Sequence, residues 1–551
     1  MSRREHWLSA ALVGLVALVA RIVAAGPIVF PQPEDTAYYV GVARNLLDGR
    51  GLVSDAIWSY QTPPLAFPRP AFEVWLPLPS FLAAIPMAIG RALGADLADL
   101  GTANRTAQAM SIAFGVLVVV LAWRLAADVA TERGLPPGRA RVLAIGTGLT
   151  SAVYLPLLLH SALPDSTMVF AAIVLGACLL MTRLLARPGG TRLRDPRLVG
   201  LGLLLGFGAL TRNEAIWLAL VWAVLAARAS LPRADRVRLI GVPAVVAIAI
   251  FAPWAIRDLV VFGNPLPGQA LANALSVRGT DIFAWADPPT LSRYLAQGLP
   301  AILGARVDGL LHNLLNVLLY LGVPLSVVGL VALPWTGRAR TLRPLLAYAV
   351  LTYLATSLLF PISTQWGTFL HAAGSIQVLL VISALLALDG LIAWVGRHRG
   401  WTRPVAWLGP AFAIAGALLF SVVVLPSFGA GTADTARRYR VIATTMAAAG
   451  VPIETGRPVI TDYPIWLAEA ERSEALALPD ETPADVRTLA RAFPGTSTVL
   501  TFGGLHETWF ATIDAGGPDA ACFTEIDLPT PPDPADAASI AGARVWRITC
   551  P

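Results

Sequence analysis

Long runs of apolar residues alternate along this chain with short polar segments, and this alternation predicts a bundle of membrane-spanning helices. The first run, Leu8 to Phe30, is long enough to cross a bilayer. Two half-length runs, Val199 to Leu210 and Ala215 to Ala227, are separated by a charged break. The other predicted spans cover residues 103–126, 142–160, 166–185, 239–261, 310–333, 345–360, 369–395 and 405–425. Together these runs predict about eleven spans.

One apolar segment does not fit this path. Phe72 to Leu93 is apolar enough to be a span, but it is interrupted by prolines. If it crossed the membrane, the arginine-rich loop from Arg124 to Arg141 would lie outside, against its charge. We therefore expect this segment to be a helix on the outer membrane surface.

Arginine-rich segments between the apolar runs predict the orientation of the chain. They are Arg124 to Arg141, Arg183 to Arg197, Arg228 to Arg238, Arg338 to Arg343 and Arg397 to Arg403. Because basic loops stay in the cytoplasm, we expect all five there, together with the basic N-terminus. An odd number of spans then places the C-terminal part outside. The expected location is the cell membrane, with many passes.

The composition agrees with this class of protein. Apolar residues make up 56% of the chain and charged residues only 14%, whereas soluble domains contain about 25% charged residues. The net charge of +6 comes from the loop arginines, so it indicates topology and not a nucleic-acid partner. The chain contains no lysine, which excludes Schiff-base and lysine-base chemistry.

The polarity pattern changes near residue 430. Short β-like runs, Arg457 to Thr461 and Ser497 to Phe502, flank a helical stretch from Pro483 to Phe493. We therefore predict a membrane domain at 1–430, with a first external loop at 31–102, and an extracytoplasmic α/β domain at 431–551. Cys522 and Cys550 fall in the second domain. We predict a disulfide between them, with two free thiols as the alternative.

Three acidic residues lie at helix ends on the predicted outer side. Glu34 and Asp35 follow the first span, and Asp165 precedes an apolar helix. Such acids could share a divalent cation, or one could act as a general base while another orients it. The alternatives are solvated loop acids at Glu34 and Asp35 and a simple helix cap at Asp165.

Other charged residues lie at the same predicted membrane face. Arg212 and Glu214 occupy the break between the two half-length runs, and such a break is tolerated only where protein or water covers it. Arg212 could contact a lipid phosphate or simply pair with Glu214. His371 begins a later span at the outer mouth, where it could bind substrate or be an ordinary hydrogen-bonded side chain.

Several short motifs, in this order and on this side of the membrane, resemble the GT-C superfamily of integral-membrane glycosyltransferases. The resemblance is nearest to the protein O-mannosyltransferase and aminoarabinose-transferase types and extends over most of the chain. The motifs are the acidic pair followed by Tyr38 to Gly49, then Trp75 to Ser80, Leu210 to Glu214, Pro253 to Asp258, Phe262 to Pro265 and Gly367 to His371.

The resemblance implies a mainly α fold and the transfer of a sugar from a polyprenyl-phosphate donor to a glycan, lipid or protein acceptor. It implies an inverting displacement on the extracytoplasmic face, with no nucleic-acid partner. The catalytic residues would be Asp35, Glu34 and Asp165, and the substrate-binding residues would be Arg212, Glu214, Arg257, His371, Tyr39 and Arg69. Family members carry an Asp-Glu pair where this chain has Glu34-Asp35, so either acid could be the base. Metal use differs within the superfamily, so the resemblance is compatible either with no cofactor or with Mg or Mn bound by Glu34, Asp35 and Asp165.

Two other classes of protein remain as alternatives. A transporter or flippase of lipids or sugars would place charges near the membrane midplane and often shows two related halves, whereas this chain has no internal repeat and groups its acids at one mouth. A non-catalytic assembly protein would not need Glu34, Asp35 and Asp165.

Overall fold

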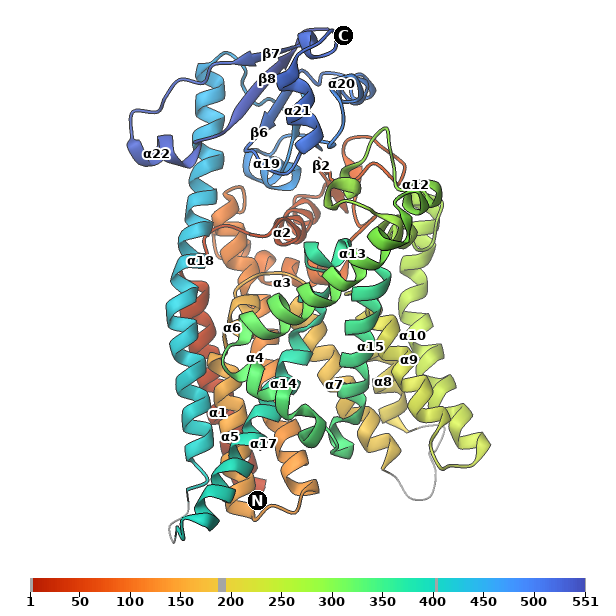
Figure 1. The fold of residues 1–551 in the computed structure, drawn as a ribbon, viewed down its shortest axis with the longest axis vertical. Helices are drawn as coiled ribbons and strands as arrows, with labels where there is room; N and C mark the ends of the chain where they lie inside the picture. Colours follow the sequence, from red (N-terminus) through yellow and green to blue (C-terminus); the bar gives the residue numbers. More distant parts are fainter. Residues whose placement is uncertain (1–2, 187–194, 402–404, 551) are drawn as a thin grey trace.

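The computed structural model describes residues 3–186, 195–401 and 405–550. A tall bundle of helices carries a small domain with a β-sheet at one end, and the N-terminus lies at the opposite end (Figure 1). This arrangement confirms the predicted fold class, which is a helical membrane bundle with a small C-terminal α/β domain.

Eight stretches of helix in the described residues are long and apolar enough to cross a membrane, and a ninth is a bent pair of helices. The continuous helices are α1 (Arg3–Ala25), α4 (Leu100–Glu132), α7 (Thr167–Leu185), α10 (Arg233–Phe262), α17 (Gly374–His398) and α18 (Leu408–Ala448). The composite stretches are α13 (Gly298–His312) with η2 (Asn313–Leu319) and η3 (Tyr320–Gly322), and η4 (Arg340–Leu342) with α15 (Arg343–Leu359). The bent pair is α5 (Pro137–Val153) with α6 (Leu155–Ser161).

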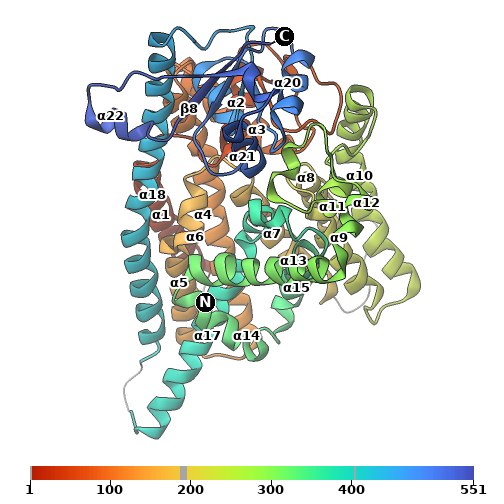
Figure 2. The same cartoon turned by 45° about the horizontal axis from the view of Figure 1, so that its top comes forward.

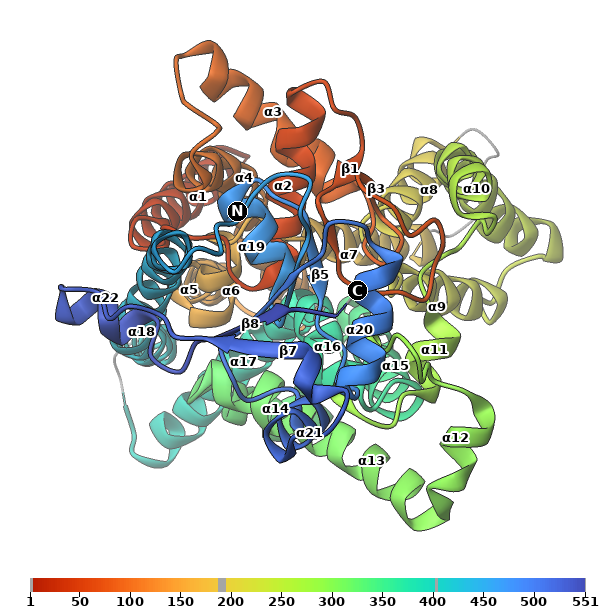
Figure 3. The same cartoon turned by 90° about the horizontal axis from the view of Figure 1, so that it is seen from above.

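The two half-length runs are also helices, α8 (Pro196–Ala209) and α9 (Ala215–Ala227). At 14 and 13 residues each is only about 20 Å long, so each is shorter than the hydrocarbon core of a bilayer. The described residues therefore contain eight or nine helices of spanning length, and the predicted total of about eleven counted these two shorter helices as well. Two spans differ clearly from their predicted bounds. The one predicted at 310–333 begins at Gly298 with α13, contains the π-helical η2 and is followed by a separate helix, α14 (Leu325–Thr336). The one predicted at 405–425 is α18, which continues to Ala448. Figure 3 shows α13 along the rim of the bundle.

The bend between α5 and α6 measures 55°. Tyr154 has an extended backbone at this point, and Pro156 lies in the first turn of α6, where its missing N–H leaves no helical bond unmade. Tyr154 also donates a hydrogen bond to the side chain of Gln377 on α17, at 2.8 Å. After the bend, His160 lies near the end of α6 and Asp165 lies in the short connection to α7; both residues are buried.

The described parts of the five arginine-rich segments lie at the end of the bundle that holds the N-terminus (Figure 1). Residues 187–194 of the second segment and 402–403 of the fifth lie outside the described residues. This common placement is what the positive-inside pattern requires.

The segment predicted as the first external loop, residues 31–102, forms two helices and three short strands. The helices are α2 (Glu34–Leu47) and α3 (Leu78–Ala92), and the strands are β1 (Val53–Ser54), β2 (Ala56–Ile57) and β3 (Arg69–Pro70). The helix predicted over Phe72 to Leu93 is therefore shorter, and its 15 residues give about 23 Å, too short for a span. It lies at the end of the bundle that carries the C-terminal domain, packed against α2 and α4 (Figures 1 and 3).

The C-terminal domain contains a six-stranded sheet in the order β2-β5-β4-β6-β8-β7. Its strands from the C-terminal part are β4 (Val459–Thr461), β5 (Ala475–Ala477), β6 (Thr498–Thr501), β7 (Phe523–Ile526) and β8 (Arg544–Ile548), and its helices are α19 (Pro464–Glu471), α20 (Pro483–Ala492), α21 (Glu507–Ala515), η6 (Ala520–Cys522) and α22 (Pro534–Ser539). The two predicted strands and the predicted helix are confirmed as β4, β6 and α20. A disulfide joins Cys522 and Cys550, as predicted.

Two features tie this domain to the bundle. Strand β2 comes from the first external loop and pairs in parallel with β5, with Ala56 opposite Ala475. Helix α18 runs along one side of the whole molecule and continues without a break into the domain (Figure 2). The predicted division between residues 430 and 431 therefore falls inside a helix.

A second external segment covers part of the same end of the bundle. It contains α11 (Ala270–Leu275), η1 (Gly279–Phe283) and α12 (Leu291–Ala296). The Glu481 carboxylate of the C-terminal domain accepts hydrogen bonds from the backbone N–H groups of Trp285, Ala286 and Asp287. The short helices η5 (Ser363–Trp366) and α16 (Thr368–Ala372) lie between α15 and α17.

Candidate active site

Asp35 lies in the first turn of α2, where the free N–H groups of the helix favour a negative charge. Its Oδ1 accepts a hydrogen bond from the N–H of Thr36 at 2.8 Å. Its Oδ2 lies 3.1 Å from Nε2 of His371. These two residues are 336 positions apart in the sequence and were predicted at the same membrane face. The fold brings them into direct contact.

His371 is the centre of a buried polar cluster. Its Nδ1 lies 2.8 Å from the Thr167 hydroxyl and 3.5 Å from Oδ2 of Asp165. Gly367 precedes it with a φ of 104°, and a Cβ there would lie 3.3 Å from the imidazole ring. Glycine is therefore needed at this turn, both for the backbone conformation and for the close approach of the ring.

Asp165 is fully buried behind His371. Its Oδ1 accepts the N–H of Thr167 at 2.7 Å, so the carboxylate caps the first N–H of α7 from the position before the N-cap residue, Ser166. Its Oδ2 lies 3.2 Å from Nδ1 of His160. Capping and participation in the cluster therefore hold together. His160 was not among the predicted site residues. Its position at the end of an apolar helix, five residues before Asp165, could have indicated it.

The pKa values in this cluster shift in opposite directions. Burial alone would raise the pKa of Asp165, but hydrogen bonds and charge from His160 and His371 outweigh it and lower that pKa below its ordinary value. Burial alone would lower the pKa of His371, but the carboxylates of Asp35 and Asp165 raise it. The arrangement therefore favours a positively charged imidazole beside the ionised carboxylate of Asp165.

Arg212 borders the cluster from the break between α8 and α9. Its Nε and Nη2 bind both carboxylate oxygens of Glu214, at 3.1 and 3.0 Å, so the predicted ion pair is present. Its other contacts run toward the cluster, from Nη1 to the Ser166 hydroxyl at 2.9 Å and from Nη2 to the carbonyl oxygen of Thr368 at 3.1 Å. Glu214 thus fixes the guanidinium beside the residues that flank Asp165 and His371.

Tyr39 lies one turn after Asp35 on α2 and is buried. Burial raises the pKa of its hydroxyl, while the charge of Arg212 opposes that shift. The hydroxyl is therefore neutral and available as a hydrogen-bond donor on the side of α2 that faces Arg212.

Three predicted residues are not part of this cluster. Glu34 turns toward the C-terminal domain, where its oxygens accept the N–H of Ile465 at 3.0 Å and the indole N–H of Trp58 at 3.3 Å. Arg69 is buried and binds Glu73 and the carbonyl oxygens of Pro64 and Thr62 within its own loop. Arg257 pairs with Asp258 on α10 at 2.8 Å.

An aromatic row extends from α2 through the external loops. Ring centroids are 4.4 Å apart for Tyr38 and Trp75, 4.9 Å for Trp75 and Trp58, 5.3 Å for Trp58 and Phe283, and 5.8 Å for Phe283 and Trp366. Trp366 lies just before Gly367 and His371 in the chain. The row therefore gives the external loops an apolar face close to the cluster.

His160, Asp165 and His371 are also a candidate site for a cation, which would bind in place of the proton on the His371 imidazole. One ligand atom from each lies within 4.8 Å of the others, and all three residues are buried. Two imidazoles and a carboxylate suit a divalent ion such as zinc better than Mg or Mn, which prefer oxygen ligands. Because Glu34 points elsewhere, the set Glu34, Asp35 and Asp165 is not brought together.

No protein-family model matches this chain, and no curated protein matches it in sequence. Its structure, however, is similar to that of ArnT from Cupriavidus metallidurans bound to undecaprenyl phosphate, with a TM-score of 0.57 and 13% identity over 99% of this chain and 98% of that one. It is also similar to the oligosaccharyltransferase AglB from Archaeoglobus fulgidus in complex with an inhibitory peptide and a dolichol-phosphate, with a TM-score of 0.53 and 14% identity over 90% of this chain and 69% of that one.

The chain has the GT-C fold. Both similar proteins are membrane glycosyltransferases of this fold, which confirms the resemblance that the sequence motifs indicated. A second AglB structure, in complex with zinc and sulfate, matches with a TM-score of 0.52 and 15% identity over 90% of this chain and 67% of that one. In this fold, the acidic residue after the first span and the buried histidines meet at the end of the bundle that carries the C-terminal domain.

Proposed function

We propose that this protein is a membrane glycosyltransferase that moves a sugar from a polyprenyl-phosphate donor to an acceptor hydroxyl or amine. One observation carries the proposal: in a GT-C fold, the Asp35 carboxylate contacts His371 at 3.1 Å, with Asp165 behind it. The similar structures contain undecaprenyl phosphate in ArnT and a dolichol-phosphate in AglB, which supports a polyprenyl-phosphate donor here. The acceptor could be a glycan, a lipid or a protein.

The reaction is an inverting displacement with Asp35 as the base. Asp35 accepts the proton of the acceptor while the acceptor atom forms a bond to the anomeric carbon of the sugar. The bond between that carbon and the phosphate oxygen breaks, and the phosphate leaves with its electron pair. His371 holds the Asp35 carboxylate through Nε2, and Asp165 orients the imidazole from the other side.

Arg212 is placed to stabilise the leaving phosphate. Glu214 fixes its orientation, and a planar guanidinium suits phosphate oxygens. Tyr39 adds a neutral donor on the same side. A divalent cation, if held by His160, Asp165 and His371, would supply further positive charge at the site. Arg69 and Arg257 stay predicted substrate ligands, although their contacts here are internal.

We further propose that the N-terminus is cytoplasmic and that the C-terminal domain is extracytoplasmic. The arginine-rich segments at the N-terminal end and the disulfide at the other end both support this orientation.

The test is an assay of the purified protein with a panel of polyprenyl-phosphate sugars and candidate acceptors. Release of free polyprenyl phosphate together with a glycosylated acceptor is the expected result. The transporter alternative is tested in parallel with the same donors in sealed liposomes. Movement of donor across the membrane, without glycosylated product from any pair, would overturn the proposal.

A further inference from the structure

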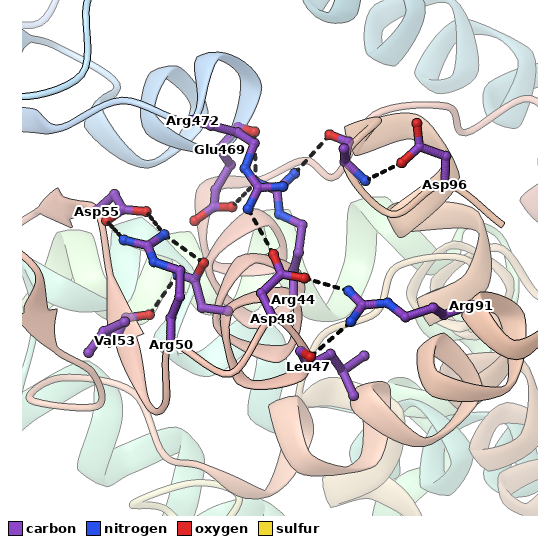
Figure 4. A network of polar contacts seen from close by, with 12 residues as sticks. Arg44, Leu47, Asp48, Arg50, Val53, Asp55, Arg91, Asp96, Glu469 and Arg472 are labelled. Carbon is purple, nitrogen blue, oxygen red and sulfur yellow. Dashed lines mark hydrogen bonds and ion pairs between the residues drawn. The ribbon is translucent and has the colours of Figure 1, made fainter.

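One side of α2 is attached to helix α19 of the C-terminal domain along its whole length. Near its start, Glu34 accepts the N–H of Ile465 at 3.0 Å. Further along, Nη2 of Arg44 donates to Oε2 of Glu469 at 2.6 Å and to the Glu469 carbonyl oxygen at 2.9 Å. Just past its end, Asp48 binds Arg472 at 2.8 Å (Figure 4).

These contacts come from a single stripe of the helix. Positions 34, 41, 44 and 48 fall within about 80° of one another around an α-helix, and Asp35 is about 100° or more away from each of them. One side of α2 therefore faces the C-terminal domain, and another side carries Asp35 to His371.

Gly41 allows the two helices to come this close. A Cβ at position 41 would lie 2.0 Å from the Glu469 carboxyl group, which leaves no room for any side chain. The Glu469 carboxylate fills this space because Arg44 holds it, and both side chains are only 3% exposed. Arg44 also donates to the carbonyl oxygen of Ala98, at 3.3 Å, so the pair is fixed on the bundle side too.

The network continues to α3 and to the loop after α2. Asp48 binds Arg91 as well as Arg472, and Arg50 binds Asp55 immediately before β2 (Figure 4). The end of α2 distant from Asp35 is therefore held from several directions at once. A helix held in this way moves as a rigid element, so a displacement at Gly41 reaches Asp35.

We propose that Arg44, Glu469 and Gly41 are positioning residues for Asp35, and that the C-terminal domain sets the position of the catalytic base through α19. This inference rests on the proposed function, because it assigns the base to Asp35. A catalytic group must be held to within about 0.5 Å, and a misplacement of about 1 Å can lower the rate about 100-fold.

The decisive variant is Gly41→Ala, which introduces a Cβ where the Glu469 carboxyl group lies. We expect kcat to fall about 10-fold to 100-fold while KM for the donor changes less than about 3-fold, because the base moves with α2 whereas Arg212, the proposed phosphate ligand, lies outside α2. The matched control is Gly431→Ala on α18, a helical glycine whose added Cβ would meet no atom within 4 Å. The control should keep both constants. An unchanged kcat in Gly41→Ala would overturn the proposal.

A double-mutant cycle separates positioning from a general loss of stability. In the background Arg44→Met/Glu469→Ala the obstructing carboxylate is absent, so adding Gly41→Ala should lower kcat less than about 3-fold further. Equal losses in both backgrounds would show that Glu469 is not the cause and would overturn the proposal. If Gly41→Ala does not fold, Glu469→Asp replaces it: the shortened acid should lower kcat several-fold at unchanged KM, and an unchanged kcat would count against positioning.

A cross-linking experiment measures the distance between positions 35 and 371 without an activity assay. Asp35→Cys/His371→Cys, with Cys178→Ser, is treated with a short bifunctional thiol reagent. Adding Gly41→Ala should lower the cross-linked fraction at least about 3-fold, and adding Gly431→Ala should not. An unchanged fraction overturns the positioning role. If the wild-type protein turns over no donor, the proposed function fails, while this measurement still decides whether α19 positions α2.

Discussion

The candidate active site and the junction between α2 and the C-terminal domain both bury carboxyl groups, but they treat them in opposite ways. Asp165 in the site is buried beside His160 and His371, and its pKa lies below the ordinary value. At the junction, burial raises the pKa of Glu34 to about 8, and the N–H of Ile465 and the indole of Trp58 offset this only in part. Burial likewise raises the pKa of Asp462 to about 6, despite a hydrogen bond from the N–H of Phe502.

These opposite pKa shifts follow from the hydrogen-bond partners of Asp165 on one side and of Glu34 and Asp462 on the other. An imidazole can become a full cation and so stabilises a buried carboxylate, whereas a neutral N–H group offers only a dipole. The site therefore holds Asp165 as a carboxylate beside its histidines, whereas Glu34 at the junction stays protonated at neutral pH as a packing group. Glu34 and Asp35 are neighbours in sequence, yet they belong to these two different environments.

The largest expected effect separates those neighbours directly. Asp35→Asn removes the proposed base and should lower the transfer rate about 100-fold or more. Glu34→Gln keeps an acceptor for the N–H of Ile465 and should lower the rate less than about 5-fold. Initial rates with saturating donor give both values. Equal losses in the two variants would mean that the adjacent acids share one role, and the distinction between site and junction would be wrong.

A smaller effect is expected at Asp165. Asp165→Asn removes one of the two carboxylates that raise the pKa of His371, so that pKa should fall and the transfer rate should drop about 10-fold. The pKa is measured by NMR titration of labelled histidine. Asp99→Asn is the matched control, because Asp99 also caps a helix, through Thr102 N at 2.7 Å, but lies outside the cluster. A rate loss in the control as large as that in Asp165→Asn would indicate that capping alone matters.

The smallest expected effect is a pH dependence of stability at the junction. The pKa of Glu34 is raised on folding, from about 4.5 to about 8, so its contribution is fully present below pH 4.5 and is lost as the pH rises through 8. Asp462 acts in the same direction at lower pH. We expect Tm to fall about 2–4 °C between pH 5 and pH 9, and Glu34→Gln should reduce that slope. A Tm that rises over this range would contradict a protonated Glu34 at the junction.

The sequence was sufficient for the bundle and for part of the site. Asp35, Asp165 and His371 could be found because each lies at the end of an apolar run on the same predicted side of the membrane. Their contacts could not be predicted, since they depend on the 55° bend after α5 and on the turn at Gly367. His160 was predicted only as part of an apolar helix, because its contact with Asp165 also depends on this bend.

The junction was harder to predict. Which of two adjacent acids faces the site depends on the rotation of α2 about its axis, and α19, more than 400 residues later, sets that rotation through Glu469. Strand β2 is only two residues long and is completed by β5 of a distant segment, so no local pattern marked it. Arg69 had a suitable charge, but its own loop supplies all its contacts.

Helix α18 has a practical consequence for imaging. Its 41 residues form one piece about 60 Å long, from the far end of the bundle into the C-terminal domain. An antibody fragment bound to that domain would therefore turn with the bundle as one particle. The C-terminal domain lies at the end of this helix, so a bound antibody fragment would provide a fixed reference for particle alignment.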